Sequence, residues 1–440
     1  MIWLERIFDP SYLDLPRFLA RPTDTGEDVS ATVARILREV RDRGDEALFE
    51  YGRKFDGVSL ARLGVSGEEL ANAGTLLPAA LRQAIARARD NIRRFHEAQK
   101  PNDEHIETEP GIFCWRKSVP IEQVGIYVPG GSAPLFSTVL MLAVPATIAG
   151  CSRVILCTPP QSDGTIHPAI LHAAYVSGVT EVFAVGGAQA IGAMAWGTES
   201  IPKVDKIFGP GNRFVTEAKI QVSGSACAID MPAGPSEVMV VIDHAADPAF
   251  AAADLLSQAE HGPDSQAILV VIADDLHAGD LLVDAVEHHL DNQLSRLGRR
   301  HLAVRSLGHS KAVIVTEPEQ AVMVINSYGP EHLLLQSATA EVLAGYVRNA
   351  GSVFIGPWSC ESAGDYASGT NHTLPTNGWA RAYSGVSLDS YFKKITFQRL
   401  ERKALCSLGP DIRIMAEAES LDAHAEAVRI RLSRNCEVST

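Results

Sequence analysis

A glutamine and a histidine three residues apart could bind a metal ion from one face of a helix. In the segment SQAEHGP, Gln258 and His261 precede a Gly-Pro pair that ends the predicted helix. Positions i and i+3 share a helical face, and an amide oxygen with an imidazole nitrogen suits zinc or another first-row divalent ion. Taken alone, the motif is more typical of a polar surface pair, because short motifs often match by chance.

A carboxylate beside an imidazole is the second group that could do chemistry. In YGPEHLLLQ, Glu331 and His332 lie between a Gly-Pro turn and an apolar run that resembles a strand. Such a pair suits general acid–base catalysis, in which each group needs a pKa near the working pH. Adjacent residues on a regular strand point to opposite faces, so both reach one substrate only if the backbone is irregular there. Alone, the pair is more often structural than catalytic.

Two polar segments near the carboxyl end carry further candidates. Asp365 and His372 are predicted to lie in a long loop, ESAGDYASGTNHTLPT, whose glycines let the backbone approach a ligand. An Asx turn with a solvated histidine explains that pattern equally well. Glu419 and His424 follow on the terminal helix or its approach, where a histidine is usually exposed to solvent. The four segments together supply nitrogen and oxygen ligands for zinc, but their spacing cannot show that they converge.

Three glycine-rich turns each follow a predicted strand, at Pro129–Gly131, Gly186–Gly187 and Gly209–Gly211. Loops at the carboxyl ends of parallel strands are where α/β sheets bind ligands. None of the three contains a GxGxxG sequence. The residues alone therefore predict tight turns and not a standard dinucleotide site.

The elements that must position these residues alternate between strand and helix from Gln123 onward. The first hundred residues read as helix, and the tail returns to helix with Leu421, Val428 and Leu432 on one apolar stripe. Strands followed by crossover helices predict a mostly parallel sheet with helices on both faces. The predicted strands are 124–128, 153–157, 181–185, 206–208, 238–242 and 267–272, and the predicted helices are 136–149, 168–177, 188–196, 213–222, 248–258 and 276–290.

Length and composition narrow the class of protein. A chain of 440 residues is too long for one hydrophobic core, so two or more globular units are expected. A net charge of −14 disfavours a nucleic-acid partner. The amino terminus lacks the order of a secretory signal, and the most apolar stretch, 132–150, contains two prolines and is predicted to be a buried core helix.

The seven cysteines include no CxxC pair, and their number is odd. This pattern favours packed thiols in a reducing compartment, for which the cytoplasm fits.

Eight motifs, in collinear order across nearly the whole chain, resemble those of the histidinol dehydrogenase family. They are YVPGG (Tyr127–Gly131), GGAQAI (Gly186–Ile191), FGPGN (Phe208–Asn212), DMPAGPSE (Asp230–Glu237), QAEHGP, PEHL, SAGDYASGTNH and the terminal LDAH. The resemblance implies two incomplete Rossmann-like parallel-sheet domains with small N- and C-terminal helical or extension domains, an aldehyde-dehydrogenase-like class of multi-domain α/β fold. The implied parts are an N-terminal extension (1–25), a first α/β domain (26–122 with 237–325), a Rossmann-like domain on the NAD side (123–236 with 326–380) and a C-terminal arm that docks on the partner subunit (381–440).

The resemblance also implies a site. It implies a homodimer with shared active sites and one zinc per subunit, held by Gln258, His261, Asp365 and His424, with His424 contributed by the other chain. The metal ligands would also touch the substrate. The further substrate contacts would be Ser236, His332, His372 and Glu419, and the NAD contacts would be Tyr127, Gln189 and Asn212. The family binds NAD without a GxGxxG sequence, so its absence here is no contradiction.

The implied activity is the last step of histidine biosynthesis, a zinc-dependent, NAD-linked four-electron oxidation of L-histidinol to L-histidine through the aldehyde. His332 would accept protons from the alcohol and then the hydrate, and Glu331 would activate water. One alternative is a related dehydrogenase of another small hydroxyl compound such as a sulfonated diol, which should lack groups such as Glu419. Others are a non-catalytic metal- or metabolite-binding relative and a structural scaffold. Partners on membranes or nucleic acids are not expected.

Overall fold

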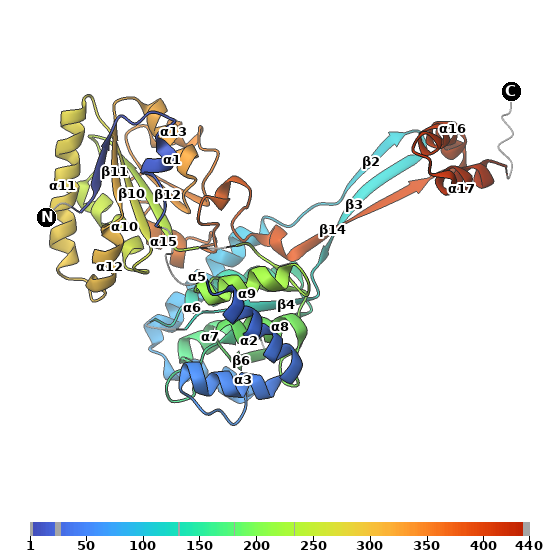
Figure 1. The fold of residues 1–440 in the computed structure, drawn as a ribbon, viewed down its shortest axis with the longest axis horizontal. Coiled ribbons are helices and arrows are strands. Elements are labelled where there is room, and N and C mark those ends of the chain that lie inside the picture. Colours follow the sequence, from blue (N-terminus) through green and yellow to red (C-terminus); the bar gives the residue numbers. More distant parts are fainter. Residues whose placement is uncertain (1–2, 23–27, 131–132, 180, 233, 434–440) are drawn as a thin grey trace. The chain divides into compact units, whose positions relative to one another are not determined.

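The computed structural model describes residues 3–22, 28–130, 133–179, 181–232 and 234–433. The chain divides into two compact units, one formed by Met1–Gln99 with Ile121–Tyr391 and the other by Lys100–Pro120 with Phe392–Thr440 (Figure 1). Some parts of the sequence-based predictions lie outside the described residues. They include Gly131 of the first glycine-rich turn, residue 132 of the apolar stretch, Ala233 of the Asp230–Glu237 motif, residues 1–2 and 23–25 of the predicted extension, residues 26–27 of the first predicted domain, and residues 434–440 of the predicted arm with Cys436.

A five-stranded parallel sheet occupies the first half of the larger unit, with the strand order β6-β5-β4-β7-β8. In chain order this is 3-2-1-4-5, which is an incomplete Rossmann arrangement. Its strands are β4 (Gln123–Tyr127), β5 (Arg153–Thr158), β6 (Glu181–Ala184), β7 (Lys206–Phe208) and β8 (Ala228–Ile229). Its crossover helices are α6 (Phe136–Ala149), α7 (Pro168–Val176), α8 (Gly187–Trp196) and α9 (Arg213–Ser223).

A six-stranded parallel sheet forms the rest of the larger unit, with the order β1-β11-β10-β9-β12-β13. Its strands are β1 (Glu5–Phe8), β9 (Glu237–Ile242), β10 (Gln266–Ile272), β11 (Lys311–Val315), β12 (His332–Gln336) and β13 (Ser352–Ile355). The associated helices are α1 (Leu15–Phe18), α10 (Pro248–Ala259), α11 (Leu276–Leu294), α12 (Arg300–Leu307), α13 (Pro318–Tyr328), α14 (Ala340–Ala344) and α15 (Glu361–Tyr366).

Both faces of this second sheet are buried, which explains why its strands read as continuous apolar runs. Along β9, Val238 and Val240 pack in one core with Leu255 of α10. Met239 packs on the opposite face with Val324 of α13. The predicted parallel sheets, with helices on both faces of this one, are therefore confirmed. The predicted strands and helices match the observed ones in type, with small differences at their ends.

The structure corrects the predicted division into domains. Helices α2 (Ser30–Arg43) and α3 (Asp45–Tyr51) pack in one core with residues of β5 and α8, so they belong with the five-stranded sheet and not with 237–325. Strand β12 pairs with β9, and β13 pairs with β12, so 326–380 does not join 123–236. The N-terminal extension is not separate either, because β1 pairs with β11. The order of strands in a sheet depends on backbone pairing, which the local apolar pattern does not reveal.

The smaller unit is an antiparallel sheet followed by two helices. The strand order is β14-β3-β2, with β2 (Glu104–Glu109), β3 (Ile112–Pro120) and β14 (Phe392–Leu400), and the helices are α16 (Arg402–Ala418) and α17 (Asp422–Ser433). A side chain at Gly409 would meet Val428 and Leu432 within about 3.1 Å, so two residues of the predicted stripe face α16. Leu421, the third residue of that stripe, is 42% exposed and precedes α17. The predicted arm thus begins at Phe392 and not at 381, and it also includes residues 100–120.

The apolar stretch predicted to form a core helix does so. From Ser137 to Ala146 every residue of α6 is buried. Among the described residues there is no helix with the length and apolar character that crossing a membrane requires. The remaining helical segments are α4 (Gly67–Asn72) and α5 (Ala79–Glu97), with short π- and 3-10 turns at Gly52–Asp56, Ala73–Leu76, Trp379–Arg381 and Leu388–Tyr391.

The cysteines only partly follow the prediction of packed thiols. Cys157 and Cys227 are buried and free, whereas the free thiol of Cys360 is exposed. Cys406 is disulfide-bonded, which departs from the prediction of thiols alone.

Candidate active site

The predicted catalytic pair lies where β12 begins. Helix α13 ends at Tyr328 and is capped by Gly329, whose φ of 64° lies in the left-handed region that glycine favours. Pro330 then turns the chain into the strand. His332 is the first residue of β12 and lies beside Val238 of β9. The pair is therefore at the amino edge of the six-stranded sheet. This is opposite to the carboxyl edge at which doubly wound sheets usually bind ligands.

The side chains of Glu331 and His332 lie close together although the residues are adjacent in sequence. His332 Nδ1 is 3.9 Å from Glu331 Oε2, and the backbone N–H of Glu237 donates to the same oxygen at 2.8 Å. Glu331 precedes the strand, so the alternation of a regular strand does not separate the two groups. Both side chains are buried.

Burial and neighbouring charges shift the pKa of both groups. Burial raises the pKa of Glu331 to about 8, although the nearby His332 lowers it in part. Burial alone would lower the pKa of His332. The carboxylates of Glu331 and Asp365 outweigh this effect, so the pKa of His332 is raised. A carboxyl group with a pKa near working pH is a stronger base than an ordinary glutamate, as proton transfer requires.

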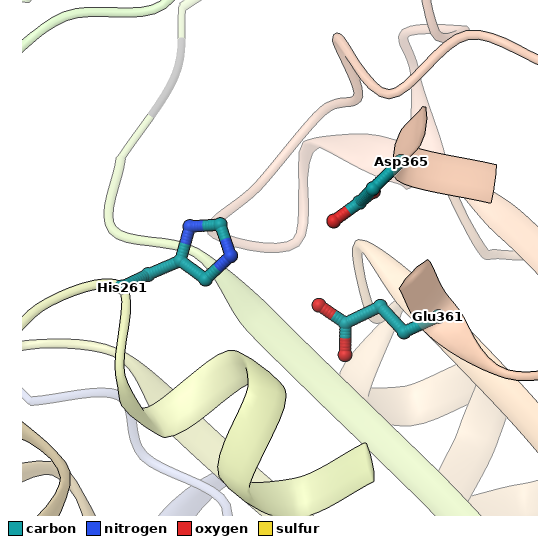
Figure 2. A group of neighbouring side chains, drawn as sticks. All are labelled: His261, Glu361 and Asp365. Carbon is teal, nitrogen blue, oxygen red and sulfur yellow. The ribbon is translucent and has the colours of Figure 1, made fainter. Parts of the chain in front are cut away.

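A possible metal site adjoins this pair. One ligand atom each from His261, Glu361 and Asp365 lie within 4.8 Å of one another (Figure 2). Glu361 and Asp365 are four residues apart on α15, so they share a helical face. His332 Nε2 lies 3.3 Å from Asp365 Oδ1, which joins the cluster to the catalytic pair. The prediction of a loop at Asp365 is wrong, because this residue is on a short helix.

Gln258 contacts the same cluster from the last turn of α10. Its side chain is fully buried. The amide satisfies its neighbours only when its nitrogen donates to Glu237 O at 3.3 Å and to Glu361 Oε1 at 3.1 Å. The structure therefore brings Gln258, His261 and Asp365 together, as the sequence-based hypothesis requires.

The residues present fit a divalent metal ion. Asp365 Oδ1 is buried, and apart from its 3.3 Å ion-pair contact with His332 Nε2 it accepts no hydrogen bond from the residues that the structure describes. A buried carboxylate oxygen that accepts no hydrogen bond favours a cation beside it. With an imidazole from His261 and the amide oxygen of Gln258, the donor set is the mixture of nitrogen and oxygen that suits zinc.

Glu361 was not predicted from the sequence. Glu361 lies four residues before Asp365, a spacing that places both on one face of a helix. That spacing would have indicated Glu361 as a candidate only if the segment had been predicted to be helical.

Two predicted substrate contacts lie near the cluster or the catalytic pair. His372 Nδ1 is 2.8 Å from the backbone oxygen of Asp365, and its Nε2 is 3.2 Å from Thr138 Oγ1 of α6. Ser236 is half-buried and directly precedes β9, next to Glu237. Glu419 and His424 are exposed residues of the smaller unit, and their place in the site stays a prediction.

The three residues predicted to contact NAD end or follow strands β4, β6 and β7 of the five-stranded sheet, at its carboxyl edge. Tyr127 ends β4, Gln189 is in the first turn of α8 after β6, and Asn212 caps α9 after β7. The backbone N–H of Gly187 donates to Tyr127 Oη at 3.0 Å. Asn212 is exposed and its Oδ1 accepts from two backbone N–H groups of α9.

Two observations at this edge fit a dinucleotide. Gln189 Oε1 is buried and has no partner within the described part of the chain. Gly209 has a φ of 124°, and a Cβ there would lie 2.0 Å from Tyr127 O, so only glycine fits. The loop is held by a buried ion pair, because Asp230 accepts from Gly209 N and Lys219 Nζ donates to Gly209 O, each at 2.8 Å. Helix amino termini with close-approaching glycines suit a pyrophosphate.

A buried carboxylate behind the cluster makes stability depend on pH. Asp254 on α10 is 5% exposed and accepts from Gln336 Nε2 at 2.6 Å. Burial raises its pKa from 3.8 to about 6. Because the folded pKa lies above the unfolded one, its favourable contribution is complete below pH 4 and is lost as the pH rises through about 6.

Asp254→Asn should therefore stabilise the metal-free protein at pH 8 by up to about 3 kcal/mol, since two pKa units correspond to about that free energy. The gain should disappear near pH 4. Urea unfolding of both proteins in a chelating buffer measures the difference at each pH. An equal difference at pH 4 and pH 8 would show that titration of Asp254 is not its cause.

Comparison with known proteins places this geometry in a family. The family model described as histidinol dehydrogenase matches residues 19–432. A histidinol dehydrogenase of Bacteroides fragilis is 53% identical over 414 residues, covering 94% of this chain and 95% of the relative. One from Vibrio vulnificus is 50% identical over 419 residues, covering 94% and 95%. The crystal structure of histidinol dehydrogenase from Elizabethkingia anophelis superposes with a TM-score of 0.94 at 48% identity, covering 98% of this chain and 99% of that one. The chain belongs to the histidinol dehydrogenase family.

Proposed function

We propose that this protein is a zinc-dependent, NAD-linked dehydrogenase that oxidises L-histidinol to L-histidine through the aldehyde. The observation that carries the proposal is the 3.3 Å contact between His332 Nε2 and Asp365 Oδ1. It joins a buried acid–base pair to a cluster of metal-binding residues, so one substrate can meet both. Membership of the histidinol dehydrogenase family supports this substrate over others.

One set of residues would bind zinc, NAD and the substrate. Gln258, His261 and Asp365, with His424 from the partner subunit, would hold zinc, and Tyr127, Gln189 and Asn212 would contact NAD. When bound, zinc would fix the substrate through its amine and imidazole nitrogens, and NAD would accept one hydride in each half of the reaction. Ser236, His372 and Glu419 would complete the contacts with the substrate.

In the first half, His332 accepts the hydroxyl proton of histidinol as hydride leaves the same carbon, which gives the aldehyde. In the second half, Glu331 removes a proton from water as the water oxygen bonds to the carbonyl carbon. His332 returns its proton to the carbonyl oxygen, which completes the hydrate and leaves the imidazole neutral. His332 then accepts a hydroxyl proton of this hydrate as the second hydride leaves, which gives histidine. Per histidinol, one water and two NAD are consumed, and two NADH and three protons are released.

The geometry suits both halves. The carboxylate of Glu331 and the imidazole of His332 are 3.9 Å apart and buried, so they can act on one carbon without bulk water between them. Burial raises the pKa of Glu331, which makes it a stronger base for the water step than an ordinary glutamate. We further propose a cytoplasmic homodimer with shared sites, in which His424 and Glu419 of the smaller unit complete the site of the partner subunit.

The choice of substrate is tested by binding. In calorimetry with the zinc-loaded protein, L-histidinol should bind and a sulfonated diol should not. The amine and imidazole nitrogens of histidinol can bind zinc and polar side chains, and a sulfonated diol lacks both groups. Binding of the diol with no binding of histidinol would instead indicate a related dehydrogenase. A protein that binds histidinol but never reduces NAD would be a non-catalytic relative, and a structural scaffold would be unaffected by removal of the metal.

A further inference from the structure

Glu361 is a carboxylate that the proposed reaction does not use, yet it is among the most buried charged groups of the larger unit. Its side chain is 1% exposed. It begins α15, and its Oε1 lies 3.1 Å from the side-chain nitrogen of Gln258 in the favoured orientation of that amide. Gln258 is itself fully buried. Because both side chains are buried, water cannot replace either partner in this hydrogen bond.

The orientation of this amide decides whether Gln258 can bind a metal ion. An amide binds cations through its oxygen, because the nitrogen lone pair is delocalised into the carbonyl. In one orientation the nitrogen donates to Glu361 Oε1 and to the backbone oxygen of Glu237. In the other orientation the amide oxygen would face these two acceptors, which repel it, and Glu361 Oε1 would lose its hydrogen bond from the amide. The favoured orientation leaves the oxygen as the free end of the side chain.

Glu361 is held in place on both of its oxygens. Ser257 Oγ donates to Oε2 at 2.9 Å, while Oε1 accepts from Gln258. Its backbone N–H faces Asp254 Oδ1 at 3.4 Å, which fixes the start of α15 against α10. Asp365 differs, because its buried Oδ1 faces His332 Nε2 at 3.3 Å and accepts no hydrogen bond from the described residues. Of the two carboxylates in the cluster, Glu361 is therefore the one fixed by hydrogen bonds on both oxygens.

We propose that Glu361 is a positioning residue that holds the Gln258 amide with its oxygen toward the metal ion, an inference that rests on the zinc site of the proposed function. Glu361 acts through Gln258 and is not itself a ligand. Residues that orient ligands in this way typically change metal affinity by about 10- to 100-fold when they are lost.

Zinc affinity of the metal-free full-length protein tests the proposal without any measurement of activity. Competition with a chromophoric chelator gives the zinc Kd of wild type, Glu361→Ala and Glu361→Gln. The alanine variant should bind zinc about 10- to 100-fold more weakly, because the amide loses the acceptor that orients it. The glutamine variant should stay close to wild type, because its oxygen can accept from Gln258 and its NH₂ can donate to Ser257 Oγ.

A glutamine variant as weak as the alanine variant would overturn the proposal, because the negative charge of Glu361 would then be what matters, as for a direct ligand. A second variant tests whether Glu361→Ala weakens zinc binding only because it disrupts the local structure. Gln258→Glu in the Glu361→Ala background supplies a carboxylate oxygen in either orientation and should regain affinity over Glu361→Ala alone. No recovery would also overturn the proposal. If wild type itself fails to bind zinc, the proposed zinc function fails, and the inference falls with it.

Discussion

Replacing His332 by glutamine should lower kcat for histidinol oxidation by about 10²- to 10⁴-fold, the range that general acid–base catalysis supplies. Glutamine has nearly the size of histidine but cannot accept a proton at neutral pH. Both hydride steps depend on a proton leaving a hydroxyl group, so both should slow. The Kd for histidinol should change much less, because His261 and Asp365 remain to hold the metal ion and the substrate.

Steady-state NADH formation gives kcat, and calorimetry gives the Kd of histidinol for the same variant. His244→Gln is a matched control, because His244 is exposed just beyond the carboxyl end of β9, at the opposite edge of the sheet. The control should keep the wild-type kcat. If His332→Gln also retained it, His332 would not be the base, whatever its distance from Asp365.

Replacing Glu331 by glutamine should separate the two halves of the reaction. The amide retains an oxygen that can accept from Glu237 N, so the local backbone should persist. It cannot remove a proton from water, however, so formation of the hydrate should slow by about 10²-fold or more. The first hydride step uses His332 and should continue. The yield in the first turnover should fall from two NADH per histidinol toward one, with aldehyde as the accumulating product.

A single-turnover experiment with limiting histidinol measures this yield, and a carbonyl-trapping reagent identifies the aldehyde. Glu341→Gln provides the matched control, because Glu341 is an exposed glutamate on α14. It should give the wild-type yield of two. Full conversion to histidine at the normal rate by Glu331→Gln would show that another group activates the water.

The parallel strands were predictable because they are buried on both faces. Runs such as Val238–Ile242 are then apolar at every position, and the helices between them end at recognisable turns. The grouping of strands into sheets was not predictable, since β12 follows β11 in the chain but pairs with β9. The domain bounds drawn from the resemblance failed for this reason at 326–380.

In the site too, local features could be predicted from the sequence and contacts between distant segments could not. Gln258 and His261 could be paired from their spacing on one helix, because helical geometry is local. The contact of His332 with Asp365 could not be predicted from the sequence, because it depends on how α15 packs beside β12. Glu361 was missed because its Gly- and Ser-rich segment reads as a loop, whereas the backbone there forms a short helix. Tertiary packing, in this case against Asp254 and Ser257, overrides the local preference.

The most direct test of the central claim is the number of NADH molecules formed per histidinol consumed by the zinc-loaded protein. The proposed four-electron reaction predicts two, with activity abolished by a chelator and restored by added zinc. One NADH per histidinol would contradict it, because the protein would then stop at the aldehyde like a simple alcohol dehydrogenase. No NADH at all would exclude histidinol as the substrate.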